Sequence, residues 1–472
     1  MSVEPLWTGL ALVGALRARV SGGFAREATG VSIDTRTLQP GDLFFAIRGD
    51  ARDGHAFVRD AFARGASAAV IDEAHASELA GAGPMFVVRD VQQSLEWLGQ
   101  RARERSRAYI AAITGSVGKT STKDMTSLVL SHFGETHSSI ASYNNHWGVP
   151  LTLARMPAST HYGVFELGMN HAGEIAALVA QVRPHVAAVT RVAAVHLENF
   201  ASIEGIADAK AEIFSGLDGG VAIINRDDDF RERLHDAAAR TAAHIFGFGE
   251  ASDADARLLS YRQIGEASAV EAEIFGRRVE YAIGAPGRHI ALNSLVALLI
   301  ASVFGVDVEA AAATLASFSP PSGRGQREII ETPAGVFTLI DESYNANPTS
   351  LRAALEQLAA ATPGPGGRRI VVLGDMLELG PEAAEMHASI APDLVRAEVD
   401  QLFTAGPLMA RLFYAAPEAM RGAHRRTAVE LEEAIVSDIH AGDIVMVKGS
   451  NGSRMSRIVA AIRKHYSPAT AG

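Results

Sequence analysis

A glycine-rich loop between a predicted strand and a predicted helix constrains the fold of this chain more than any other feature. The apolar run Tyr109–Thr114 leads into the loop, and a helical pattern follows over residues 123–130. The loop itself consists of Gly115, Ser116, Val117, Gly118, Lys119, Thr120 and Ser121. Glycines allow backbone N–H groups to surround phosphates at a helix N-terminus, so this order of strand, loop and helix predicts a nucleotide site in an α/β domain.

The polar side chains of the loop fit that interpretation. Lys119 is placed to reach the terminal phosphates of a nucleotide, and Thr120 is placed to ligate Mg²⁺. The general pattern begins with glycine where this chain has Ile113, so the loop is a shortened variant. The alternative is a strand-to-helix turn that contains glycine and lysine by chance. A phosphate loop alone also does not distinguish a ligase from a switch or a motor.

The rest of the chain divides into three regions, in agreement with the two to four domains expected for 472 residues. Residues 1–105 contain short strands and turns, residues 106–320 alternate strands with helices, and residues 321–472 resume this alternation after a linker at 319–323. Such alternation favours mostly parallel sheets with helices on their faces. We therefore expect an α/β protein with three domains.

Composition excludes several classes of function. The net charge of -11 argues against a nucleic-acid partner, because binding a phosphate backbone needs a basic face. The absence of cysteine excludes disulfides, thiolate nucleophiles and cysteine–zinc sites. No signal-peptide pattern is found in the first residues, and the most apolar helical stretch, 295–304, is too short to span a bilayer. We expect a cytoplasmic protein that is not embedded in a membrane.

One lysine is predicted to lie on the apolar face of a helix. Residues 202–217 have a helical pattern with Ser202 as N-cap, and Lys210 falls in the middle of the apolar stripe, whereas Asp208 and Glu212 are predicted to face away. Burial of an ammonium lowers its pKa, and the neutral amine could react with carbon dioxide to form a carbamate. A lysine that extends along the apolar surface to reach water is equally compatible with the periodicity.

Two further polar residues follow predicted strands. Glu166 ends the strand around residues 164–167, and His196 follows the strand at 186–192. Ligands of open α/β sheets bind outside the carboxyl ends of the strands, and Mg²⁺ prefers oxygen ligands. Glu166 is therefore a candidate Mg²⁺ ligand, whereas the residues alone hardly distinguish His196 from an ordinary loop histidine.

With the loop 115–121, Glu166, His196 and Lys210 in this order, nearly the whole chain resembles the Mur ligase family of peptidoglycan precursor synthesis. The resemblance implies three domains: an N-terminal α/β domain that binds the UDP end of the substrate, a central ATPase-like domain with a mostly parallel sheet, and a C-terminal Rossmann-like ligase domain. It also implies that Lys210 is carbamylated near Mg²⁺ and that Glu166 and His196 are metal ligands.

The C-terminal region points to one branch of that family. Residues 341–348 read Asp-Glu-Ser-Tyr-Asn-Ala-Asn-Pro, which is similar to the signature of ligases that join D-alanyl-D-alanine to UDP-N-acetylmuramoyl-tripeptide, although those more often begin with two aspartates. Independently, Asn347 and Pro348 form a good helix start. The resemblance assigns substrate contacts to Asn145, Tyr344, Asn345 and Asn347, nucleotide contacts to Asn293, Arg324 and Asp341, and a place at the reaction centre to Lys448.

Two parts of the resemblance are weaker. In the N-terminal region, Thr35, Arg36 and Arg48 are chemically suited to uridine diphosphate, but turns with solvated arginines would give the same pattern. Near the expected adenine site, Ile290 stands where relatives usually have asparagine, and isoleucine cannot donate an amide hydrogen bond. Asn293, three residues later, is kept.

Together these features predict an ATP-dependent, amide-forming ligase with ATP and Mg²⁺ as cofactors and UDP-N-acetylmuramoyl-tripeptide and D-alanyl-D-alanine as substrates; we expect a monomer. The nearest rival is the ligase that adds the third amino acid to a dipeptide precursor, but its Asp-Asn-Pro-Arg motif is absent. A folate polyglutamate ligase fits the N-terminal region and residues 344–348 less well. A regulatory phosphate-loop module without ligase activity would require neither Lys210 on its apolar stripe nor the C-terminal signature.

Overall fold

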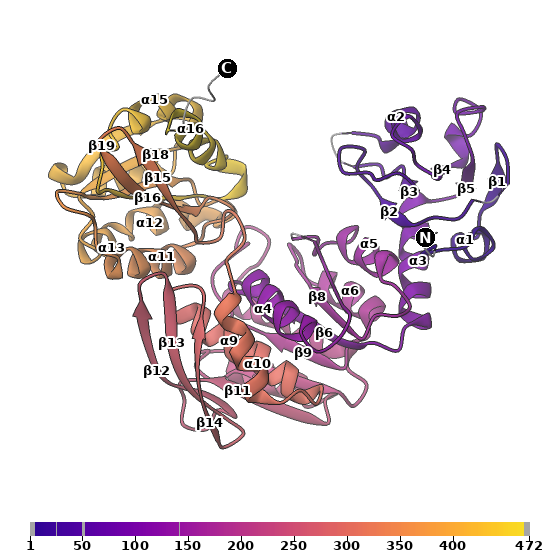
Figure 1. Ribbon diagram of the computed structural model, residues 1–472, viewed down its shortest axis with the longest axis horizontal. Coiled ribbons are helices and arrows are strands. Elements are labelled where there is room, and N and C mark those ends of the chain that lie inside the picture. The colour runs from indigo at the N-terminus through magenta and orange to yellow at the C-terminus, as the bar shows by residue number, and fades with distance from the viewer. Residues whose placement is uncertain (1–4, 25, 50–51, 141, 467–472) are drawn as a thin grey trace.

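The computed structural model describes residues 5–24, 26–49, 52–140 and 142–466. Figure 1 shows three lobes that follow one another along the chain, with the N-terminal and C-terminal lobes on opposite sides of the central one. Each lobe contains one β-sheet covered by helices. The structure thus confirms the predicted three-domain α/β architecture.

The N-terminal sheet has five strands in the order β1-β5-β4-β3-β2. All neighbours are parallel except β1 and β5. Its elements are α1 (Gly9–Leu16), β1 (Arg19–Ser21), β2 (Gly30–Ser32), β3 (Asp42–Phe45), α2 (Val58–Ala63), β4 (Ala68–Asp72), β5 (Met85–Val88) and α3 (Val91–Arg105). Helix α3 packs against α5 (Gly148–Arg155) of the central domain and joins the two domains.

The central sheet has nine strands in the order β14-β13-β12-β11-β10-β9-β6-β8-β7. It is parallel from β7 to β12 and antiparallel over the last two strand pairs. Its strands are β6 (Tyr109–Thr114), β7 (Thr136–Ser138), β8 (Tyr162–Glu166), β9 (Val186–Val189), β10 (Val221–Asn225), β11 (His244–Gly249), β12 (Ala256–Ile264), β13 (Ala267–Ile274) and β14 (Arg277–Ile283).

Helices cover both faces of this sheet and form two cores. One core contains residues of α4 (Lys119–Ser131), α9 (Arg288–Val303) and α10 (Val308–Thr314). The other contains residues of α5 (Gly148–Arg155), α6 (Glu174–Val182), α7 (Ile203–Ala211) and α8 (Arg231–Ala238). The central parallel strands are continuous apolar runs because both of their faces are buried.

The C-terminal sheet has six strands in the order β15-β16-β20-β17-β18-β19, and only the pair β15 and β16 is antiparallel. Its strands are β15 (Gln326–Thr332), β16 (Gly335–Glu342), β17 (Arg369–Gly374), β18 (Gln401–Ala405), β19 (Arg421–Arg425) and β20 (Ile444–Lys448). Its helices are α11 (Pro348–Ala360), α12 (Ala383–Ala388), α13 (Ala391–Arg396), α14 (Met409–Ala415), α15 (Ala428–Val436) and α16 (Ser456–Tyr466).

The predicted helix over residues 202–217 is only partly regular. Ser202 caps α7 as predicted, but the α-helix ends at Ala211 and a 3₁₀ helix, η3 (Glu212–Gly216), follows it. Asp208 is exposed and Glu212 is half-buried. The carboxylate of Glu212 accepts hydrogen bonds from the backbone N–H groups of Gly173 and Ala176, where α6 begins, and so satisfies donors that a helix start leaves free.

Among the helices of the described residues, none is long and apolar enough to cross a bilayer.

Candidate active site

A cavity of about 860 Å³ lies between the central and C-terminal domains. It opens at the carboxyl ends of the parallel strands β6, β8, β9 and β10, where open α/β sheets bind their ligands. Most of the predicted site residues line it: Ser116, Val117, Gly118, Lys119, Thr120, Ser121, Asn145, Glu166, His196, Asn293, Arg324, Tyr344, Asn345, Asn347 and Lys448. The structure therefore brings together residues from distant parts of the sequence.

The phosphate loop turns sharply between β6 and α4. Gly118 has a φ of +85°, and a Cβ at this position would lie 2.8 Å from the side chain of Asn293, so glycine is required there. Lys119 bends back over the loop, and its Nζ donates a hydrogen bond to the carbonyl of Gly115 at 2.6 Å. Thr190, which follows β9, supports the loop by donating to the carbonyl of Val117 at 2.6 Å.

Two oxygen-bearing side chains meet at the start of α4. The Thr120 hydroxyl donates to Oε2 of Glu166 at 2.8 Å, and Asn144 Nδ2 donates to Oε1 of Glu166 at 2.7 Å. Thr120 and Glu166 are buried side by side next to the phosphate loop. A hydroxyl and a carboxylate beside the position of nucleotide phosphates fit the oxygen ligands that Mg²⁺ prefers.

Lys210 is only 1% exposed, so the structure excludes a lysine that reaches solvent. Burial lowers the pKa of Lys210 well below its usual value, and the neighbouring charge of Lys119 lowers it further. Glu166, Glu212 and Glu174 act in the opposite direction. Lys210 is not among the residues that line the cavity, and its burial favours the neutral amine that carbamate formation requires.

His196 contacts the C-terminal domain. Its Nδ1 lies 2.5 Å from Oε2 of Glu378, a residue 182 positions later in the chain. Both residues line the cavity. The predicted metal ligand His196 is thus held by a carboxylate from another domain.

Arg324 and Lys448 also reach the cavity from the C-terminal domain. The guanidinium of Arg324 stacks over the ring of Tyr344 at 4.1 Å and donates to the hydroxyl of Ser142 in the central domain at 2.9 Å. Lys448 Nζ donates to Glu342 at 2.9 Å and to the backbone carbonyl of Asn345 at 3.0 Å. Two cations of the C-terminal domain therefore line the same cavity as the phosphate loop, and Lys448 does so in an ion pair with Glu342.

Other predicted residues serve local structure as well. Asn347 caps α11 in a reciprocal arrangement with Ser350, as its alternative interpretation predicted. The side-chain oxygen of Asn145 accepts hydrogen bonds from Trp147 and Gly148 at the start of α5. Asp341 does not line the cavity; its carboxylate accepts hydrogen bonds from the backbone and hydroxyl of Ser343, whereas its neighbour Glu342 faces the cavity.

Ile290, which stands where relatives usually have asparagine, does not line the cavity. Its side chain is buried in the core between α9 and the sheet. His289, Leu292 and Asn293 of the same helix line the cavity instead. A buried apolar residue at position 290 is what this packing requires.

The three predicted UDP contacts lie in the N-terminal domain, away from this cavity. Thr35 is buried beside Asp60, and Arg36 pairs with Asp34 at 2.5 Å. Arg48 pairs with Asp53 at 3.0 Å. Both arginine side chains remain largely exposed, so they are accessible to an anionic ligand.

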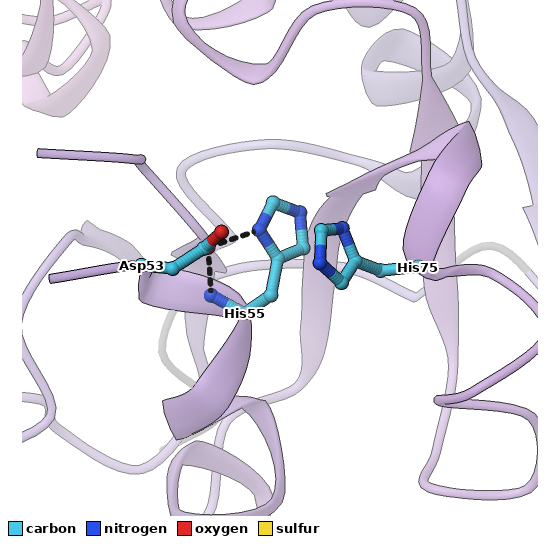
Figure 2. Close-up of side chains that lie close together, drawn as sticks. All are labelled: Asp53, His55 and His75. Atoms are coloured by element: carbon cyan, nitrogen blue, oxygen red, sulfur yellow. Dashed lines mark hydrogen bonds and ion pairs between the residues drawn. The ribbon is translucent and has the colours of Figure 1, made fainter.

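Asp53 belongs to a cluster with His55 and His75 (Figure 2) whose ligand atoms lie close enough to suggest a metal site. The hydrogen bonds argue against one. His55 Nδ1 bonds Asp53 at 2.6 Å, and its Nε2 accepts from the backbone N–H of Asp72, so neither ring nitrogen is free. The two imidazoles are stacked 3.9 Å apart, and nitrogen lone pairs lie in the ring planes, so one ion cannot face both rings. The cluster instead fixes Asp53, which holds Arg48.

Asn144 is a site residue that the sequence did not single out, although it belongs to a matched segment. We expect Asn144→Ala to raise the Mg²⁺ concentration for half-maximal activity about 10- to 100-fold, because Glu166 Oε1 loses its donor. Phosphate release measured against Mg²⁺ concentration tests this, with the unfolding temperature as a control for folding. A Mg²⁺ curve that superimposes on that of the parent would show that Asn144 does not position Glu166.

Three family models match successive parts of the chain. The Mur ligase family, catalytic domain, matches residues 27–106, the Mur ligase middle domain matches 113–301, and the Mur ligase, glutamate ligase domain, matches 324–451. Together with the phosphate loop and the interdomain cavity, these matches show that the chain belongs to the Mur ligase family.

Individual relatives and solved structures show which ligases of the family this chain resembles. A protein of Rickettsia prowazekii named UDP-N-acetylmuramoyl-tripeptide–D-alanyl-D-alanine ligase is 32% identical over 96% of this chain and 99% of its own length. The crystal structure of MurF from Acinetobacter baumannii is 28% identical, has a TM-score of 0.83, and covers 98% of this chain and 100% of its own. MurF from Thermotoga maritima in complex with ADP shares the fold at 23% identity and a TM-score of 0.76, over 93% of this chain and 97% of its own.

Proposed function

We propose that this chain joins D-alanyl-D-alanine to the terminal carboxylate of UDP-N-acetylmuramoyl-tripeptide at the expense of ATP. The observation that carries this proposal is the single cavity in which the phosphate loop and Glu166 face Arg324, Tyr344 and Lys448. Relatives named for this reaction match nearly the full length of the chain. We further propose that residues 1–105 bind the UDP end, residues 106–320 bind ATP and residues 321–472 complete the ligase site.

The chemistry follows from the weakness of a carboxylate as an electrophile. Transfer of the γ-phosphoryl group of ATP to the tripeptide carboxylate gives an acyl phosphate, and the free amine of D-alanyl-D-alanine then displaces phosphate to form the amide. Lys119 on one wall and Arg324 and Lys448 on the other neutralise charge on the transferring group. The interdomain position of the cavity limits the access of water to the acyl phosphate.

Thr120, Glu166, His196 and the carbamate of Lys210 would hold Mg²⁺, with Thr120 and Glu166 already in hydrogen-bond contact. When bound, the ion supplies charge stabilisation to the phosphate oxygens. The carbamate would replace a buried cation, whose own charge is disfavoured by burial, with an anion that could help to hold Mg²⁺. The burial of Lys210 next to Lys119 and Glu166 supports the proposed carbamate.

Arg36 and Arg48 would bind the diphosphate of the UDP group, since both are exposed in the N-terminal domain, and Thr35 would lie beside it. Binding would compete with the ion pairs to Asp34 and Asp53. We also propose that the enzyme acts in the cytoplasm, where ATP and nucleotide-linked precursors are found.

Product mass tests the reaction. Purified protein with MgATP, UDP-N-acetylmuramoyl-tripeptide and D-alanyl-D-alanine should give a UDP-linked pentapeptide whose mass is the sum of the two substrates less one water. A control replaces D-alanyl-D-alanine with single amino acids and the tripeptide with the dipeptide precursor. A product only in the control reaction would assign the chain to the ligase that adds the third residue.

A further inference from the structure

The contact between His196 and Glu378 connects a predicted metal ligand to a different domain. His196 follows β9 in the central domain, and Glu378 follows β17 in the C-terminal domain. Their side chains lie 2.5 Å apart between Nδ1 and Oε2. The mechanism proposed above gives no role to Glu378.

Both residues of this contact have an unusual backbone conformation. His196 has a φ of +56° and Glu378 a φ of +63°, a conformation that residues with a Cβ rarely adopt. The two segments also approach each other closely, because a Cβ at Gly380 would lie 3.4 Å from the carbonyl of Leu197. Leu377, Glu378 and Leu379 all line the cavity. Backbone strain of this kind concentrates at functional sites, where the surrounding structure maintains it.

The hydrogen bond also selects the nitrogen of His196 that can bind a metal. A carboxylate accepts hydrogen bonds, so the proton lies on Nδ1 and the lone pair of the neutral ring lies on Nε2. Within the described residues, no hydrogen bond to Nε2 is found. Histidine ligands of metal ions usually donate their second ring nitrogen to a carboxylate or a carbonyl, which fixes the ring and the tautomer.

We propose that Glu378 is a positioning residue that holds His196 with Nε2 available for the metal ion that accompanies ATP. This inference rests on the proposed function for the identity of the metal site. Because Glu378 belongs to the C-terminal domain, His196 is held in this orientation only when that domain is seated on the central domain. The metal affinity of the nucleotide complex is thereby coupled to domain closure.

An ordinary interdomain ion pair is the alternative. The side chain of Glu378 is 44% exposed, and an exposed pair contributes little to stability. The two explanations differ in metal binding: an ion pair that only joins the domains leaves the metal affinity of the nucleotide complex unchanged, whereas a positioning residue changes it.

Mn²⁺ binding to the full-length protein with a non-hydrolysable ATP analogue, followed by electron paramagnetic resonance, separates these explanations. We expect Glu378→Ala to weaken Mn²⁺ binding about 10- to 100-fold. Glu378→Gln should stay within about threefold of the parent, because its amide oxygen still accepts the hydrogen bond from Nδ1. Glu382→Ala is the matched control: this glutamate is exposed, lies on the same segment, and does not line the cavity.

Parental Mn²⁺ affinity in a folded Glu378→Ala variant would overturn the proposal, and so would a Gln variant as weak as Ala. Should the Ala variant fail to fold, Glu378→Asp keeps the charge but shortens the reach, and it should weaken Mn²⁺ binding like Ala; parental affinity in the Asp variant would overturn the proposal. The measurement needs no muramoyl substrate, so it is independent of which peptide the enzyme ligates. A parent protein that binds no Mn²⁺ with the analogue would instead contradict the proposed ATP site.

Discussion

Replacing Lys210 with alanine is expected to lower ligase activity by at least about 10³-fold, because the variant loses the proposed carbamate, one of the groups that would hold Mg²⁺. The lysine is 1% exposed, and burial together with the charge of Lys119 lowers its pKa. This environment favours the neutral amine that formation of the proposed carbamate requires.

Chemical rescue tests the carbamate directly. Bicarbonate or a short carboxylic acid should partly restore phosphate release to Lys210→Ala, because a small anion can occupy the space left by the side chain. Lys464→Ala is the matched control, since Lys464 is exposed on α16 and should retain full activity without rescue. Undiminished activity of Lys210→Ala would rule out the role of Lys210 at the metal.

Lys119→Met should reduce kcat about 10²- to 10³-fold, because it removes a positive charge from the phosphate loop while keeping a side chain of similar length. The positive charge of Lys119 also affects the pKa of Lys210. Since Lys119 lowers the pKa of Lys210, its removal raises that pKa, and the neutral amine then forms only at higher pH. The activity that remains should therefore have a pH optimum above that of the parent.

Steady-state phosphate release over a range of pH measures both effects. The KM for the UDP-linked substrate should stay within about threefold of the parent, because the predicted UDP contacts lie in another domain. A loss confined to KM, with kcat unchanged, would show that Lys119 binds substrate without acting on the transferring phosphoryl group.

Local sequence predicted the elements that position the site. The strand Tyr109–Thr114 was predicted with its observed bounds, because it is an apolar run that ends at Gly115. Helix α4 begins at Lys119, four residues before the predicted start, since the phosphate loop itself is its first turn. Helical periodicity placed Lys210 on the apolar stripe but was equally compatible with a side chain that reaches water, and the structure shows that the side chain is buried.

Contacts between distant segments could not be predicted in the same way. Glu378 meets His196 across 182 residues, and no local pattern marks it. Glu212 caps α6, a helix that only the tertiary fold brings close to it, and the sequence did not predict this role. Asp341 does not line the cavity although its neighbour Glu342 does, because successive side chains of a strand point to opposite faces.

The central claim is that this chain ligates D-alanyl-D-alanine to UDP-N-acetylmuramoyl-tripeptide, and phosphate release with each co-substrate omitted in turn tests it most directly. The account predicts release from MgATP only when both co-substrates are present. Release that instead needs a dipeptide precursor and one amino acid would contradict the assignment, and release without either co-substrate would indicate an ATPase module and not a ligase.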